Sequence, residues 1–98
     1  MEIDYMYNIY TGNHLANQFK VCDKGKTYLK SYNVIIAGVD DETGDVELYN
    51  VAGYSNTMRK YLYQFLWESG RNDLSNRKKL DKAIKAGKVK VFDESPKL

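Results

Sequence analysis

Residues 55–70 read SNTMRKYLYQFLWESG, and this stretch decides the fold class of the 98-residue chain. Its large apolar residues recur at the i, i+3, i+4, i+7 and i+8 spacing of one helical face: Met58, Tyr61, Leu62, Phe65 and Leu66. Ser55 or Asn56 can cap the start of a helix, and Gly70 can end it. The stretch predicts an amphipathic helix over residues 55–69 that packs on another element.

The residues before this helix have the pattern of strands. Residues 33–39 form the most apolar run and are rich in β-branched residues, which indicates a central strand buried on both faces. Residues 19–23 and 27–30 flank Gly25 and predict a hairpin. Gly44 lies in an acidic turn over residues 40–45 that leads to another strand over 46–51. Residues 2–10 suggest a first strand or an irregular arm, and residues 11–18 a turn or a short helical turn.

The residues after this helix predict one more helix and one more strand. Leu80, Ala83 and Ile84 form a narrow apolar stripe over residues 75–86, and Gly87 follows as a stop. Residues 89–92 suggest a last strand, and the tail around Pro96 is expected to fray. We therefore expect a single α+β domain over residues 1–98. It has a small antiparallel sheet of four to five strands, the amphipathic helix packed on one face, and a second short basic helix.

Composition places the chain among globular proteins, since 43% of its residues are hydrophobic and 29% are charged. The single cysteine, Cys22, excludes an internal disulfide and favours a cytoplasmic compartment. No run approaches the roughly 20 apolar residues that cross a bilayer, and the N-terminus lacks the pattern of a signal peptide. We expect no membrane association.

No residue pattern points to catalysis or to a metal. His14 is the only histidine, Cys22 has no nucleophile signature around it, and the glycines form no phosphate loop. The acidic residues near Gly44 lack the spacing of a calcium loop. The sequence predicts a protein that is not an enzyme, with no cofactor and no metal.

Binding surfaces are the more informative feature. Nine of the thirteen aromatic residues are tyrosines, whose apolar ring and polar tip suit both the rim of a sheet and a contact surface. Acidic side chains between residues 40 and 47 form either a solvated turn or a local mimic of phosphates. The residues predicted to bind a protein partner are Tyr5, Tyr7, Trp67, Asp40, Asp41, Glu42, Asp45 and Glu47.

Residues 71–90 carry eight basic and two acidic side chains, a net charge of +6, although the whole chain is only +2. Such a basic helix either is a solvated face that favours its own negative C-terminal end or contacts phosphates. The alternative function is therefore an accessory protein that binds nucleic acid. Its contact residues would be Arg77, Lys78, Lys79, Lys82 and Lys85.

A resemblance narrows these alternatives. Residues 29–66 resemble small uncharacterised proteins of bacteriophages and mobile elements of Gram-positive bacteria, although a histidine common in their helix is absent here. The resemblance implies a phage-type inhibitor or adaptor, similar to anti-CRISPR proteins, that binds a host protein or ribonucleoprotein complex in the bacterial cytoplasm. It implies neither a specific partner nor an oligomeric state. The matching residues are Ser31, Tyr32, Asn33, Ile35, Ile36, Ala37, Tyr54, Ser55, Thr57, Arg59, Lys60, Phe65 and Leu66.

Overall fold

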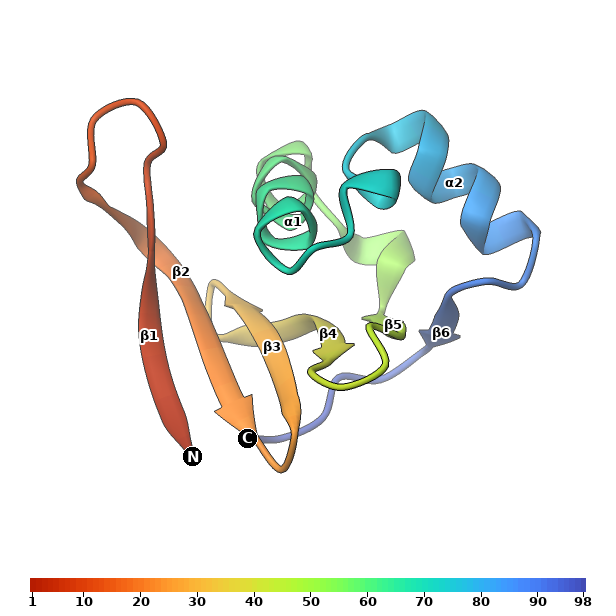
Figure 1. Ribbon diagram of the computed structural model, residues 1–98, viewed down its shortest axis with the longest axis horizontal. Coiled ribbons are helices and arrows are strands. Elements are labelled where there is room, and N and C mark those ends of the chain that lie inside the picture. Colours follow the sequence, from red (N-terminus) through yellow and green to blue (C-terminus); the bar gives the residue numbers. More distant parts are fainter.

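Six strands form one sheet in the order β1-β2-β3-β4-β5-β6, in a computed structural model that describes residues 1–98 (Figure 1). The strands are β1 (Glu2–Tyr7), β2 (His14–Asp23), β3 (Lys26–Ser31), β4 (Val34–Asp40), β5 (Val46–Tyr49) and β6 (Lys90–Phe92). Neighbours are antiparallel except β5 and β6, which are parallel. The predicted α+β class is confirmed. The expectation of four to five antiparallel strands is wrong in detail, because the helical connection after β5 returns the chain to the same end of the sheet and lets β6 run parallel.

The N-terminal hairpin differs most from its prediction. Residues 14–18 were expected to form a turn or a helical turn, but they belong to β2, in which Leu15 and Gln18 are buried. Asn17 has a φ of 63°, a left-handed conformation that asparagine tolerates and that interrupts the alternation of a strand. This local irregularity hides the strand pattern in the sequence.

The two α-helices begin at capping residues. α1 (Asn56–Glu68) starts after Ser55, whose hydroxyl oxygen accepts a hydrogen bond from the Met58 N–H at 3.1 Å, and Gly70 follows its end with a φ of 81°. α2 (Arg77–Lys85) starts two residues later than predicted because Asn76, not Ser75, caps it. Short 3₁₀ turns, η1 (Val51–Gly53) and η2 (Asn72–Leu74), precede the two helices. Neither helix has the length and apolar character that a bilayer-spanning helix needs.

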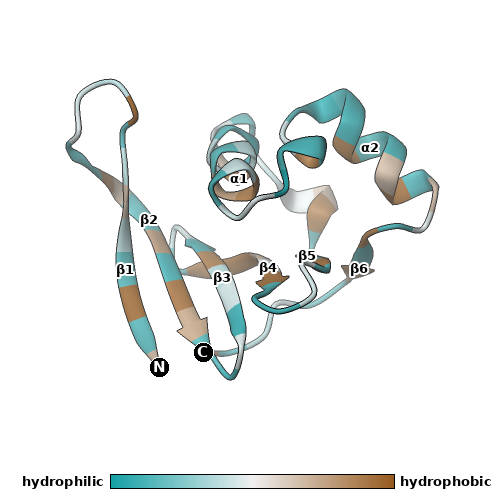
Figure 2. Ribbon diagram, in the orientation of Figure 1, coloured by the Kyte–Doolittle hydropathy of each residue, from teal (hydrophilic) through white to brown (hydrophobic).

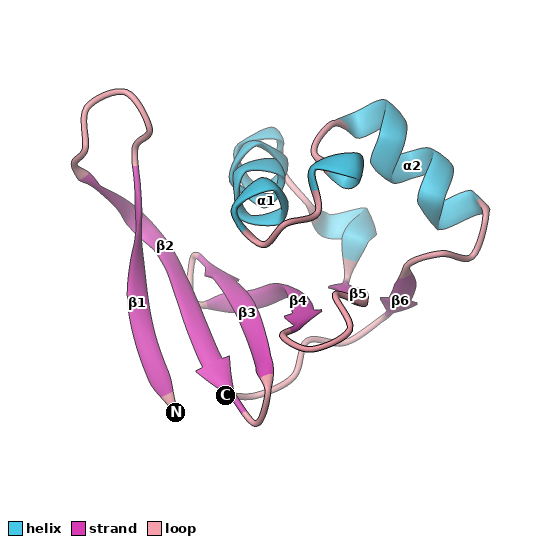
Figure 3. Ribbon diagram, in the orientation of Figure 1, coloured by secondary structure: helices cyan, strands magenta, loops and turns pink.

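Both helices lie on the same side of the sheet (Figure 3). The sheet register places Leu29, Ala37 and Leu48 in one row across β3, β4 and β5, and these residues belong to the same core cluster as the apolar stripe of α1. β4 is the most uniformly hydrophobic strand, whereas α2 is mostly hydrophilic (Figure 2). Burying each large side chain of α1 contributes about 1.5–3 kcal/mol, so this contact dominates the stability of the fold. Its fully buried residues are Leu62, Phe65 and Leu66.

The other face of the sheet carries no helix but has a small cluster of its own. Val21, Ile35 and Tyr49 are buried there, and Tyr28 packs against them. The Tyr28 ring lies over Gly38, where an added Cβ would be only 2.9 Å from a ring carbon. The prediction that residues 33–39 form a central strand buried on both faces is therefore confirmed.

Replacing Leu62, which is fully buried, tests the packing of α1 on the sheet. We expect Leu62→Ala to lower the free energy of unfolding by about 2–5 kcal/mol, because it leaves a cavity. Leu62→Asp should prevent folding, because it buries an unpaired charge. The measurement is urea unfolding followed by circular dichroism.

Thr57→Ala is the matched control for this prediction, since Thr57 is exposed on the same helix and its substitution should change the free energy of unfolding by less than about 0.5 kcal/mol. Normal stability of Leu62→Asp would show that α1 packs through another face.

Candidate partner-binding groove

An open groove of about 320 Å³ lies between the tip of the β1–β2 hairpin and α1. Six of its ten lining residues are hydrophobic, and three of these are well exposed: Ile9 at 63%, Tyr10 at 90% and Trp67 at 57%. Groups of exposed aromatic and aliphatic side chains of this kind mark contact surfaces. The other lining residues are Asn8, Leu15, Lys60, Tyr61, Tyr63, Gln64 and Ser75.

The hairpin tip is held in shape by one asparagine. The side-chain oxygen of Asn8 accepts hydrogen bonds from the backbone N–H groups of Tyr10 at 2.8 Å and Thr11 at 3.0 Å. The carbonyl of Asn8 also accepts from the N–H of Gly12 at 2.9 Å, where a φ of 76° suits glycine. The tip therefore presents Ile9 and Tyr10 without help from a ligand.

Polar contacts tie this hairpin to α1. The side-chain amide of Gln64 donates to the Tyr7 carbonyl at 2.7 Å and to the Glu68 carboxylate at 2.7 Å. The Glu68 carboxylate also forms an ion pair with Lys20 of β2 at 2.6 Å. Because both walls of the groove are linked at these points, the groove is a formed feature of the fold.

The α1 wall comes from a face beside the core stripe. Lys60, Tyr63, Gln64 and Trp67 follow one another at i, i+3, i+4 and i+7, so they share one side of the helix. That spacing was visible in the sequence, but only Trp67 was predicted to bind a partner. The tip residues could not be paired with this face before the fold was known.

The predicted aromatic contacts divide between two places. Trp67 lines the groove. Tyr7 lies beside the groove, where its backbone carbonyl accepts a hydrogen bond from the lining residue Gln64. Tyr5 is 51% exposed but packs elsewhere, with its ring centroid 4.9 Å from that of His14 and 5.5 Å from that of Phe19. The structure therefore does not bring Tyr5 and Trp67 into one site.

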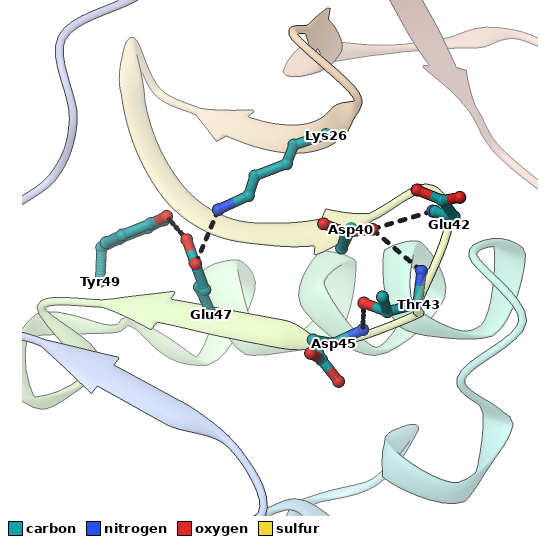
Figure 4. Close-up of polar contacts among 7 residues, drawn as sticks. All are labelled: Lys26, Asp40, Glu42, Thr43, Asp45, Glu47 and Tyr49. Atoms are coloured by element: carbon teal, nitrogen blue, oxygen red, sulfur yellow. Dashed lines mark hydrogen bonds and ion pairs between the residues drawn. The ribbon is translucent and has the colours of Figure 1, made fainter.

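The predicted acidic surface is also divided, and Figure 4 shows its two parts. Asp40 accepts hydrogen bonds from the backbone N–H groups of Thr43 and Glu42, both at 2.9 Å, and these bonds hold the pKa of Asp40 below its ordinary value. Asp41 accepts from the Thr27 hydroxyl at 2.6 Å, whereas Asp45 is exposed on the far side of the turn. These contacts give the carboxylates of Asp40 and Asp41 a structural role in the turn.

Glu47 belongs to the open face of the sheet and not to that turn. Its carboxylate accepts from Lys26 at 2.7 Å and from the Tyr49 hydroxyl (Figure 4). Burial alone would raise the pKa of Glu47, but the hydrogen bonds from Lys26 and Tyr49 lower it below its ordinary value. Burial and the bond to Glu47 raise the pKa of Tyr49. This charge is compensated inside the protein, which makes Glu47 unsuitable as a mimic of phosphate.

The predicted basic surface is present on α2. Lys78, Lys79, Lys82 and Lys85 are exposed and make no ion pair, while Arg77 lies 3.7 Å from Asp81. Leu80 and Ala83 anchor the opposite side of the helix in the core. The lysines are free to meet an anion, and Lys79 and Lys82 line an open depression of about 290 Å³ together with Lys88 and Asp73.

The two residues considered for catalysis lie apart from these surfaces. The His14 ring packs against the Tyr5 ring at a tilt of 40°, and the Cys22 sulfur is 3.7 Å from the Thr27 hydroxyl. No group of three or more histidine, cysteine, aspartate and glutamate residues has the arrangement of a metal site. These contacts give His14 and Cys22 packing roles.

The Glu47 ion pair makes stability depend on pH in a defined direction. A carboxyl group whose pKa is lowered by folding stabilises the protein above its unfolded pKa of about 4.3, and this contribution is lost as the pH falls through the folded pKa. We expect Glu47→Gln to lower the free energy of unfolding by about 1 kcal/mol at pH 7. The difference from wild type should shrink at about pH 3.

Urea unfolding of both proteins at the two pH values measures this difference. Glu42→Gln is the control, because Glu42 is exposed and its side chain has no partner; its effect should stay below about 0.5 kcal/mol at both pH values. A Glu47→Gln effect that grows toward acid pH would contradict the assignment.

Residues 1–82 match the sequence model of a protein family of unknown function, DUF8033. The matched residues include both walls of the groove, the acidic turn and most of α2, but not β6. No curated protein and no solved structure matches the chain.

Proposed function

The chain belongs to the family of unknown function DUF8033, and we propose that it is a non-enzymatic binding protein that holds a segment of a protein partner in the groove between the hairpin tip and α1. The observation that carries this proposal is the exposure of Ile9, Tyr10 and Trp67 on the walls of one groove. Leaving such large apolar side chains in water is unfavourable, and a partner that covers them gains their burial.

The linked walls favour binding further. The groove exists before a partner arrives, so little ordering entropy is lost when a segment enters it. Aromatic anchors at the centre of an interface usually carry most of its energy. Tyr10 and Trp67, which come from the two walls, are the residues expected to do so here.

The biological setting remains the one implied by the resemblance of residues 29–66: an inhibitor or adaptor of a host protein or ribonucleoprotein complex, of the anti-CRISPR kind, encoded by a phage or mobile element. The groove supports binding to a protein and is compatible with either role. The groove residues Ile9 and Tyr10 lie outside the resembling stretch, and Trp67 directly follows it.

The second candidate function is binding of nucleic acid through α2. The observation that favours it is the row of exposed lysines without ion pairs. If Lys78, Lys82 and Lys85 neutralise three phosphates, the logarithm of the affinity should fall with the logarithm of the salt concentration with a slope of about −3. The depression lined by Lys79, Lys82 and Lys88 has no aromatic side chain on which a base could stack.

Substitutions on the two surfaces separate these functions. For the proposed function we expect Trp67→Ala or Tyr10→Ala to weaken partner binding by about 2 kcal/mol or more, roughly 30-fold. The triple variant Lys78→Gln, Lys82→Gln, Lys85→Gln should weaken it by less than about 1 kcal/mol. The assay is affinity capture from the cells that carry the gene, followed by titration of the purified partner.

Circular dichroism controls for folding of all variants. The proposed function would be overturned if the lysine variant abolished binding while Trp67→Ala left it intact. Loss of salt-dependent binding to a single-stranded oligonucleotide in the same lysine variant would then establish the second function.

A further inference from the structure

The groove continues into a second depression along α1. This depression of about 340 Å³ shares Lys60 and Tyr63 with the groove and is otherwise lined by Asn56, Arg59 and Arg77. Together the two form a strip, called here the α1 strip, that is apolar at the hairpin tip and basic at the start of the helices. A segment lying along it meets both environments.

The basic end of the α1 strip carries positive charge that acidic side chains do not fully compensate. Lys60 makes no ion pair and lies 5.4 Å from the centroid of the Tyr61 ring. Arg59 and Arg77 share a single carboxylate, Asp81, at 3.7 Å each, a distance longer than that of a good hydrogen bond. Three cations therefore face one acidic group. A guanidinium has five N–H donors. The Arg77 side chain is 65% exposed, so most of its donors are available, whereas the Arg59 side chain is only 16% exposed and donates to the Tyr63 hydroxyl at 3.3 Å.

The apolar end has no free acidic group to oppose an incoming segment. Glu68, the nearest acidic residue of α1, is already held by Lys20 and Gln64. A carboxylate that follows an apolar anchor would therefore find attraction at one end of the α1 strip and no unpaired like charge at the other.

We propose that the α1 strip binds an acidic peptide segment of the partner, with a large apolar side chain against Ile9, Tyr10 and Trp67 and carboxylates beside Lys60 and Arg77. This inference rests on the proposed function and adds the chemistry of the partner. Carboxylates pair well with arginine because the planar guanidinium donates hydrogen bonds to both carboxylate oxygens.

A peptide fits the α1 strip better than a nucleic acid does. Lys60 is the single cation of the α1 strip without a counter-charge, which is too little positive charge for a chain of phosphates. The apolar end offers aliphatic as well as aromatic contacts, whereas a strand of nucleic acid needs a continuous positive groove. One or two peptide carboxylates need fewer cations on the protein than a strand of nucleic acid does.

Selection from a random library of 12-residue peptides displayed on yeast, with the full chain as bait, tests the inference. We expect the enriched peptides to contain Trp, Phe or Leu next to Asp or Glu. Synthetic copies of the best peptides, measured by fluorescence anisotropy, should bind at least tenfold more weakly to Lys60→Glu and to Trp67→Ala. The matched control Lys82→Glu makes the same charge change on α2, away from the α1 strip, and should alter the affinity less than twofold.

Three results would overturn the inference, and they are distinguishable. If the enriched peptides are neutral or basic and their binding depends on Trp67 but not on Lys60, the acidic segment is ruled out, whereas the groove remains a binding site. No enriched peptide, or peptides indifferent to Trp67→Ala, would count against both the segment and the groove. A labelled 12-nucleotide oligothymidine that binds wild type more tightly than the best peptide and depends on Lys60 would assign the α1 strip to nucleic acid.

Discussion

The packing of the apolar stripe of α1 against the middle of the sheet is the constraint on which the rest of the structure depends. Leu62, Phe65 and Leu66 are fully buried in one cluster with Leu29, Ala37 and Leu48. A helix that buries one face must present the adjoining faces elsewhere, and this orientation turns Lys60, Tyr63 and Trp67 toward the hairpin tip. The groove is therefore a consequence of core packing, completed by the hydrogen bond from Gln64 to the Tyr7 carbonyl.

The charged side chains of the surface differ in whether they have partners within the protein. The carboxylates of Asp40, Asp41 and Glu47 are occupied by turn, strand and ion-pair contacts, which leaves them little to offer a partner. The lysines of α2 are unpaired, but the depression beside them has no large exposed apolar side chain, since its apolar lining is Leu74, Ala83 and Ala86. Along α1 a groove lined by exposed apolar side chains adjoins an unpaired cation, and there we propose the interaction surface.

The local pattern of the sequence was sufficient for α1, for the central strand and for the β2–β3 turn, because each depends on periodicity or on a residue that caps or turns the chain. β6 was expected as a strand. Its parallel pairing with β5 depends on the end of the sheet to which the helical connection returns the chain. Residues 14–18 were misread because Asn17 breaks the alternation of β2. The groove joins Tyr10 to Trp67 across the sequence, and no local pattern reports a contact between such distant positions.

Trp67 is the only tryptophan, so its fluorescence reports on this junction directly. The most direct test of the account is the accessibility of Trp67 to acrylamide, with the indole excited selectively, in wild type, Gln64→Ala and Tyr32→Ala. Gln64→Ala removes the hydrogen bond to the Tyr7 carbonyl that links the hairpin to α1. Tyr32 is 47% exposed and does not line the groove. If the hairpin tip lies against α1 and covers part of Trp67, Gln64→Ala increases the quenching of Trp67 and Tyr32→Ala leaves it unchanged. Equal quenching in all three proteins would show that the tip does not lie against α1 and would contradict the account.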